Sequence, residues 1–191
     1  MPMRSLRHQS APSPGGASET PEVNAIWRWS RNKVMNRSDV DLLLVDNNQE
    51  DVDMVLHALR RGSFASNSSF VGEGAEALDF VFCRGAFAER SLRNSPKLIL
   101  LDMALPDGSG LEILRNLKSD PRSRLIPIVV MISARDEQYL KDARRYGANA
   151  CIRKPADAGE FGLLLKTLGH YWLKINQPPV HNPALRLVGA Q

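Results

Sequence analysis

Three charged residues of the sequence have side chains that could bind a metal ion and a phosphoryl group. Asp46, Asp102 and Lys154 directly follow the first, third and fifth short apolar segments of the chain. Neighbouring carboxylates repel each other and favour a hard dication such as Mg²⁺, which binds one or two carboxylates together with waters and phosphoryl oxygens. The Lys154 ammonium would compensate the charge of a phosphoryl group. An aspartate held beside Mg²⁺ can attack phosphorus, so the three residues together predict an aspartyl-phosphate site.

Asp102 on its own leaves two interpretations open. It follows residues 98–101, an aliphatic run too short for a helix and bounded by Pro96 and Pro106, which predicts a strand buried on both faces. Ligands bind at the carboxyl ends of parallel strands in open α/β sheets. Aspartate is also frequent as a helix cap or turn residue in such a place. Only complementary residues at other strand ends can decide between the two.

The elements that must position these residues alternate regularly. We expect strands at residues 40–45, 70–71, 98–101, 126–132 and 150–153, and helices at 49–61, 75–82, 111–117, 136–146 and from 157 onward. Parallel neighbours need right-handed helical crossovers, so this order predicts an α/β protein with a doubly wound, five-stranded parallel sheet flanked by helices. The ends of the first, third and fifth strands then meet at one edge of the sheet.

The basic charge of the chain is concentrated near its N-terminus. Residues 1–38 carry six basic and two acidic side chains, and this excess equals the net charge of +4 of the whole chain. We expect a flexible basic tail at 1–38, one domain at 39–175 and an irregular C-terminal tail at 176–191. The nearly neutral domain argues against nucleic-acid binding. Without a secretory signal or an apolar run of about 18 residues, we expect a cytoplasmic protein that makes no membrane contact.

The last expected helix is more apolar than one sheet face requires. Phe161, Leu165 and Trp172 recur at heptad-like spacing, and Tyr171 widens the stripe. We interpret these four residues as an interface with another protein surface, such as that of a homodimer. The alternative is that the extra apolar residues pack against the C-terminal segment.

Three segments carry a resemblance to a known family. They are Leu-Leu-Val-Asp-Asn-Asn at residues 43–48, Leu-Leu-Asp at residues 100–102 with Pro106 and Gly110 following, and Lys-Pro at residues 154–155. Together they resemble the receiver domains of two-component response regulators, over residues 40 to about 173. The resemblance implies a flavodoxin-like receiver fold and a signalling protein rather than an enzyme.

A closer likeness is to the single-domain regulators paired with phytochrome-type histidine kinases, through residues 77–80, the long loop before Pro96 and the ending at 171–173. The resemblance implies a sensor histidine kinase as partner, with a bacteriophytochrome as one candidate, and output through partner binding or dimerisation.

The family's site residues carry over by motif. The resemblance implies that Asp102 accepts the phosphoryl group, that Lys154 contacts it, and that Mg²⁺ is held by Asp46, Asp102 and the Ala104 carbonyl. Asn47 replaces a second acidic residue and would be a weak metal ligand.

Two positions of the conformational switch depart from the family pattern as well. Ile132 stands where a switch Thr or Ser is expected, which leaves Ser133, one residue later, as the candidate hydroxyl. A one-residue shift changes the face that a strand residue occupies. Cys151 stands at the usual aromatic position. With Asn47, these departures keep a second hypothesis open: a degenerate receiver used as a phosphate-independent dimerisation or docking module. A third, a hydrolase using Asp102 as nucleophile, lacks any recognisable substrate pocket or cap domain.

Overall fold

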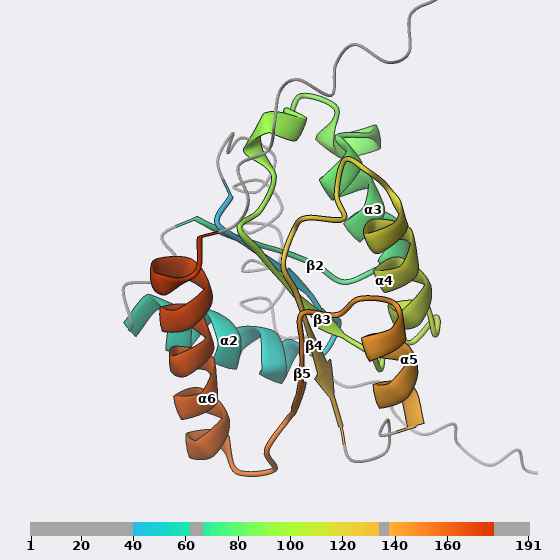
Figure 1. The fold of residues 1–191 in the computed structure, drawn as a ribbon. Helices are drawn as coiled ribbons and strands as arrows, with labels where there is room; N and C mark the ends of the chain where they lie inside the picture. Colours follow the sequence, from blue (N-terminus) through green and yellow to red (C-terminus); the bar gives the residue numbers. More distant parts are fainter. Residues whose placement is uncertain (1–39, 62–66, 134–137, 178–191) are drawn as a thin grey trace, which may run out of the picture.

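A computed structural model describes residues 40–61, 67–133 and 138–177. Its centre is one sheet of five parallel strands in the order β2-β1-β3-β4-β5 (Figure 1). The strands are β1 (Leu42–Val45), β2 (Ser68–Val71), β3 (Leu98–Asp102), β4 (Ile128–Ile132) and β5 (Ala150–Arg153). The helices are α2 (Gln49–Arg61), α3 (Gly74–Phe82), α4 (Gly110–Ser119), α5 (Leu140–Arg145) and α6 (Ala158–His170), which continues as a π-helical segment at Tyr171–Ile175. The predicted fold class is confirmed.

Most predicted elements begin or end one or more residues away from their boundaries in the structure, as the fourth strand and the fourth helix illustrate. The fourth strand was expected from residue 126, but β4 begins at Ile128, since Pro127 has no N–H to donate to a sheet ladder. The fourth helix was expected at 136–146, and α5 covers Leu140–Arg145. Residues 134–137 lie outside the described part of the chain, as do the predicted N-terminal tail and residues 178–191.

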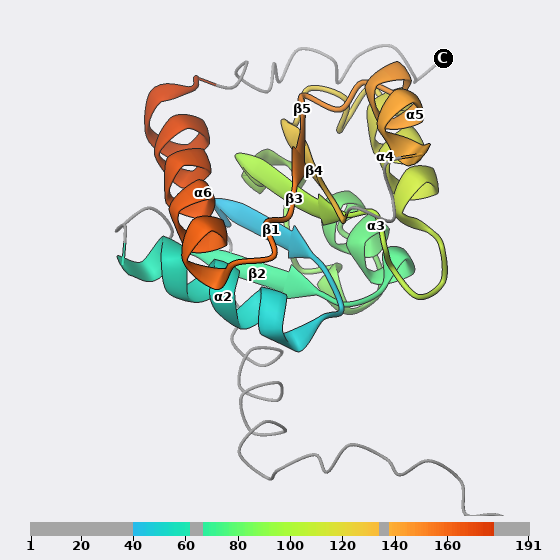
Figure 2. The same cartoon turned by 90° about the horizontal axis from the view of Figure 1, so that it is seen from below.

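Helices cover both faces of the sheet. In Figure 2, α2 and α6 lie side by side on one face, and α3, α4 and α5 lie on the other. Every residue of β1, β3 and β4 is buried, which explains why these strands are continuous apolar runs without polar alternation. β5 forms one edge of the sheet and is only half-buried. No helix in the three described ranges has the length and apolar character that a membrane span requires.

The strand register aligns the carboxyl ends of β1, β3, β4 and β5 along one edge of the sheet. Val45 of β1 pairs with Leu101 of β3, so Asp46 and Asp102, the next residues of each strand, leave the sheet side by side. On the other side of β3, Asp102 pairs with Met131 of β4. Ile132, at the end of β4, pairs with Arg153, the residue before Lys154. The edge predicted from the sequence therefore exists, and it lies at the carboxyl ends of the three strands.

Most of the apolar stripe of α6 packs in the hydrophobic core. Phe161 and Leu165 are 2% and 0% exposed and pack with α2 and the sheet, so they are not available to a second subunit as the interface prediction requires. The heptad-like spacing that suggested an interface arises because α6 lies on the sheet. Trp172 is half-buried against the same core, whereas Tyr171 is 49% exposed. Of the four residues predicted to form an interface, Tyr171 alone is exposed.

Candidate functional site

Lys154 is the centre of a cluster of acidic side chains. Its Nζ atom lies 3.0 Å from Asp46 Oδ2 and 3.0 Å from Asp102 Oδ2. A third carboxylate joins them, because Asp51 Oδ2 lies 2.8 Å from the same nitrogen. The structure therefore brings together the three residues that the sequence placed at strand ends, and it adds one residue from α2.

The two strand-end carboxylates are held in the same way. In each, Oδ1 accepts a hydrogen bond from the backbone N–H two residues further on: Asn48 N to Asp46 Oδ1 at 2.8 Å, and Ala104 N to Asp102 Oδ1 at 3.2 Å. Each Oδ2 is thereby directed to Lys154. The turn after each strand fixes the orientation of its carboxylate, which is how aspartate commonly shapes a loop.

Lys154 reaches the cluster from the end of β5. Its backbone N–H donates to the Ile132 carbonyl at 2.9 Å, which extends the β4–β5 pairing by one residue. Its side chain is only 13% exposed. A lysine so far from water needs opposite charges around it, and the three carboxylates supply them.

Burial and charge act against each other in this cluster. Burial raises the pKa of Asp46 to about 6, although Lys154 beside it favours the ionised form. Burial alone would lower the pKa of Lys154, but Asp46 and Asp102 raise that pKa above its ordinary value. Lys154 therefore stays charged, and Asp46 protonates more readily than an ordinary aspartate does.

Asp51 was missed by reasoning from the sequence. It lies in the first turn of α2, where acidic residues commonly interact with the helix dipole, and the helix was considered only for its apolar face. The available signal was its spacing from Asp46. Asn48 caps the helix, with Oδ1 accepting from Glu50 N at 2.9 Å, so a residue one turn on can point back toward the strand end.

The remaining predicted metal ligands lie at the rim of this site. Ala104 and Asn47 are both exposed, each close in sequence to one of the buried carboxylates. Among the described residues, no set of three or more acidic, His or Cys side chains encloses a metal position. Asp51, Asp46 and Asp102 converge on an ammonium instead. Two buried carboxylates are still the donor set that Mg²⁺ uses, with waters and phosphoryl oxygens completing its shell.

Of the predicted switch residues Ile132, Ser133 and Cys151, only Ser133 carries a hydroxyl. Ile132, the last residue of β4, is 3% exposed and belongs to the core under α3, α4 and α5. Ser133 follows it at the end of the strand and is half-buried. Cys151 packs against the same core, and burial raises the pKa of its thiol.

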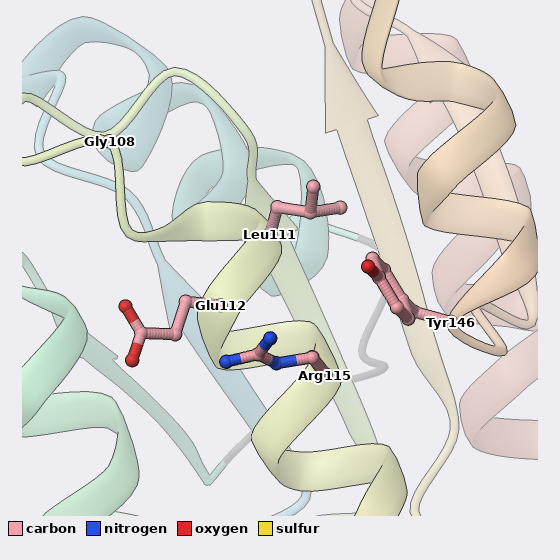
Figure 3. A pocket seen from close by; sticks show the side chains of 5 residues that line it. All are labelled: Gly108, Leu111, Glu112, Arg115 and Tyr146. Carbon is pink, nitrogen blue, oxygen red and sulfur yellow. The ribbon is translucent and has the colours of Figure 1, made fainter.

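A separate groove lies on the face of α4. It has a volume of about 250 Å³, and its lining includes Leu111, Glu112 and Arg115 of α4 and Tyr146 after α5 (Figure 3). The side chain of Leu111 extends toward Tyr146, while that of Arg115 extends toward Glu112, away from Tyr146. None of the residues around Lys154 lines this groove.

Known proteins share both the sequence pattern and this fold. The probable methanogenesis regulatory protein FilR2 of Methanothrix harundinacea is 28% identical over 138 residues, which cover 72% of this chain and 86% of FilR2. Response regulator Rcp1 of Synechocystis is 26% identical over 70% of this chain and 88% of its own length.

Solved structures show the same architecture. The phosphorylated cyanobacterial phytochrome response regulator RcpA superposes with a TM-score of 0.68 at 29% identity, over 74% of this chain and 99% of RcpA. The Mn²⁺-bound form of Rcp1 superposes with a TM-score of 0.66 at 24% identity, over 72% of this chain and 97% of that one, and supports the fold alone.

The family description that matches the sequence covers most of the residues that the structure describes. Residues 42–166 match the response regulator receiver domain. This range begins at β1 and ends within α6, so it includes the whole sheet and every residue of the Lys154 cluster. The chain therefore belongs to the response regulator receiver family, and it is similar to response regulator Rcp1 and to the phytochrome response regulator RcpA.

Proposed function

We propose that the protein accepts a phosphoryl group on Asp102 from the phosphohistidine of a sensor histidine kinase, and that it signals through partner binding or dimerisation. The observation that carries this proposal is the arrangement of Asp46, Asp102 and Lys154 at one sheet edge, with both carboxylates 3.0 Å from the ammonium. Membership of the receiver family supports it. A phytochrome-type kinase is the proposed donor, because two relatives are phytochrome response regulators, and we expect the transfer to occur in the cytoplasm.

Phosphoryl transfer requires two contributions from this chain, a positioned carboxylate and a compensating positive charge. A carboxylate oxygen of Asp102 forms a bond to phosphorus while the phosphorus–nitrogen bond of the phosphohistidine breaks, and the electron pair of that bond stays on the imidazole nitrogen. Lys154, already 3.0 Å from Asp102, compensates the negative charge of the transferred group. Asp46 keeps Lys154 directed toward the strand end.

A divalent cation fits the same site. Asp46 and Asp102 would hold it, with the Ala104 carbonyl and Asn47 at the rim, and when bound it would neutralise phosphoryl oxygens. Hard carboxylate oxygens at the mouth of a buried acidic cluster suit Mg²⁺ or Mn²⁺. The similar protein Rcp1 has been solved with Mn²⁺ bound.

The test is intact-protein mass after incubation with a small-molecule phosphodonor, with and without Mg²⁺. We expect one added phosphoryl group on the wild type, and none on Asp102→Asn or without Mg²⁺. Asp107→Asn is the matched control, because Asp107 lies in the loop that follows Asp102 but is exposed, with its Oδ1 accepting hydrogen bonds from the N–H and the hydroxyl of Ser109. Labelling that persists in Asp102→Asn would contradict the proposal.

A second candidate function is a receiver that docks without phosphate. The buried Ile132 and the half-buried Cys151, at positions where the family has a switch hydroxyl and an aromatic residue, favour it. A folded, dimeric protein that gains no phosphoryl group in the same experiment would support this alternative.

The proposed dimer contact lies on the last helical segment. Leu163, Tyr171 and Ile175 are all large apolar residues that are about half exposed or more, at 66%, 49% and 56%. All three lie on the continuous helical segment of residues 158–175, and exposed apolar surface of this kind commonly marks a protein contact. We assign this contact to a second copy of the chain.

A further inference from the structure

Asp51, in the first turn of α2, contacts Lys154 together with the two carboxylates at the strand ends. Its Oδ2 atom lies 2.8 Å from Lys154 Nζ, and its side chain is 20% exposed. Asp46 Oδ2 and Asp102 Oδ2 lie 3.0 Å from the same nitrogen. No two of these oxygens can therefore be farther apart than about 6 Å, a range over which charges interact strongly in a partly buried site.

The charge balance of the cluster depends on Asp51. Asp46, Asp102 and Lys154 alone would leave one negative charge at the strand ends. Asn47 is neutral and exposed, so it adds nothing to this charge. With Asp51 the cluster has three carboxylates around one ammonium, which leaves two negative charges. Two negative charges match one dication.

We propose that Asp51 supplies, from the first turn of α2, the negative charge that Asn47 fails to supply to the cation site. This inference rests on the proposed cation site and deepens it. Asp51 acts through charge and through its contact with Lys154, so it is a positioning residue and not a cation ligand. Asp51 attracts the Lys154 ammonium, which would otherwise repel a cation bound beside Asp46 and Asp102.

The local structure explains why position 51 can do this. Asn48 Oδ1 accepts hydrogen bonds from the backbone N–H groups of Glu50 at 2.9 Å and of Asp51 at 3.4 Å, which fixes the start of α2 directly after the turn at Asp46. One turn of helix brings the side chain of residue 51 back over that start. Asp53, two residues further on, is exposed and accepts from Gln49 Nε2 at 2.9 Å instead.

The experiment measures Mn²⁺ binding directly, by the loss of the free-ion electron paramagnetic resonance signal, on the full chain without any phosphodonor. We expect Asp51→Asn to weaken Mn²⁺ binding by about tenfold or more, since ligand and neighbouring charge set the affinity of such sites. Asp53→Asn removes the same charge from the exposed face of the same helix, and we expect it to bind Mn²⁺ like the wild type. Adding Asn47→Asp to Asp51→Asn should restore the affinity.

Three results would overturn the inference: unchanged binding by Asp51→Asn, equal weakening by Asp53→Asn, or no recovery in the double variant. Thermal melting of each variant without cation separates these effects from a role of Asp51 in helix stability, because a purely structural residue would change the melting temperature and leave the Mn²⁺ affinity of the folded protein unchanged. Failure of phosphoryl labelling would count against the proposed function, while the Mn²⁺ titrations would still test Asp51.

Discussion

Asp46 has the least solvated carboxylate of the site, and its protonation should be visible in stability. Its folded pKa of about 6 lies above the ordinary value of 3.8, because burial disfavours the ionised form. Between pH 3.8 and pH 6, the Asp46 carboxyl is therefore mostly protonated in the folded state and mostly ionised in the unfolded state. The resulting stabilisation is complete below pH 3.8 and disappears as the pH rises through 6.

The prediction concerns the difference between the wild type and Asp46→Asn without divalent cation. Raising the pH from 5 to 7.5 should lower the free energy of unfolding of the wild type by about 1 kcal/mol more than that of Asp46→Asn, which has no carboxyl to titrate there. Urea denaturation at the two pH values measures this. An equal change in both proteins would show that Asp46 does not titrate in this range.

Gly110 allows α4 to begin directly against the loop that carries Asp102. A Cβ atom at this position would lie 3.0 Å from the Asp102 carbonyl oxygen and 3.0 Å from backbone atoms of Met103. Backbone atoms cannot move aside as a flexible side chain can, so we expect Gly110→Ala to destabilise the protein by about 1 to 3 kcal/mol in chemical denaturation.

The matched control is Gly162→Ala in α6, where an added Cβ meets nothing within 4 Å. Alanine favours a helix over glycine, so this variant should be as stable as the wild type or up to about 1 kcal/mol more stable. Equal stability changes in the two variants would contradict the close approach at Gly110.

At the scale of elements, Lys118 connects the end of α4 to the starts of two strands. Its Nζ donates to the Arg124 carbonyl at 3.2 Å, the Ile126 carbonyl at 2.8 Å and Asn149 Oδ1 at 2.7 Å. Asn149 Oδ1 also accepts from Ile128 N at 2.9 Å. The amine thus holds together the approaches to β4 and β5, at the opposite ends of these strands from the site.

Lys118→Met keeps most of the aliphatic chain but removes all three donors. The Ile126 carbonyl then loses a partly buried hydrogen bond, and the Arg124 carbonyl and Asn149 Oδ1 each lose one donor, so we expect a loss of about 1 to 3 kcal/mol in the free energy of unfolding. Lys166→Met on the exposed side of α6 is the control and should change stability by less than about 0.5 kcal/mol. Similar losses in both variants would mean that the Lys118 bonds contribute little.

At the scale of the whole molecule, the proposed dimer contact uses the exposed apolar residues of α6 and of the helical segment that continues it. Sedimentation velocity of the wild type should show a dimer, and Leu163→Ser combined with Tyr171→Ser should shift it toward the monomer, because the two residues are 66% and 49% exposed. Both lie outside the core, so the double variant should melt close to the wild type.

Trp172→Ala is the less specific variant, because Trp172 packs against the core of its own chain. Lower thermal stability is expected there whatever the oligomeric state. An unchanged sedimentation profile of the Leu163→Ser, Tyr171→Ser variant would contradict a dimer through this segment.

The sequence by itself determined the order of elements and the meeting of three charged residues. Apolar runs such as residues 98–101 indicate strands buried on both faces, and parallel strands place their carboxyl ends at one edge. Once Asp46, Asp102 and Lys154 each follow a predicted strand, their convergence follows from topology alone, because strand direction fixes the end at which each strand leaves the sheet.

Only the tertiary structure decided the two points that depend on helix orientation. Asp51 joins the site because α2 starts directly at the strand end and turns one particular face to Lys154. Phe161 and Leu165 belong to the core because α6 lies against α2 on the sheet. A helical pattern shows which residues share a face, but what that face meets depends on how the helices pack, and packing involves contacts between residues far apart in the sequence.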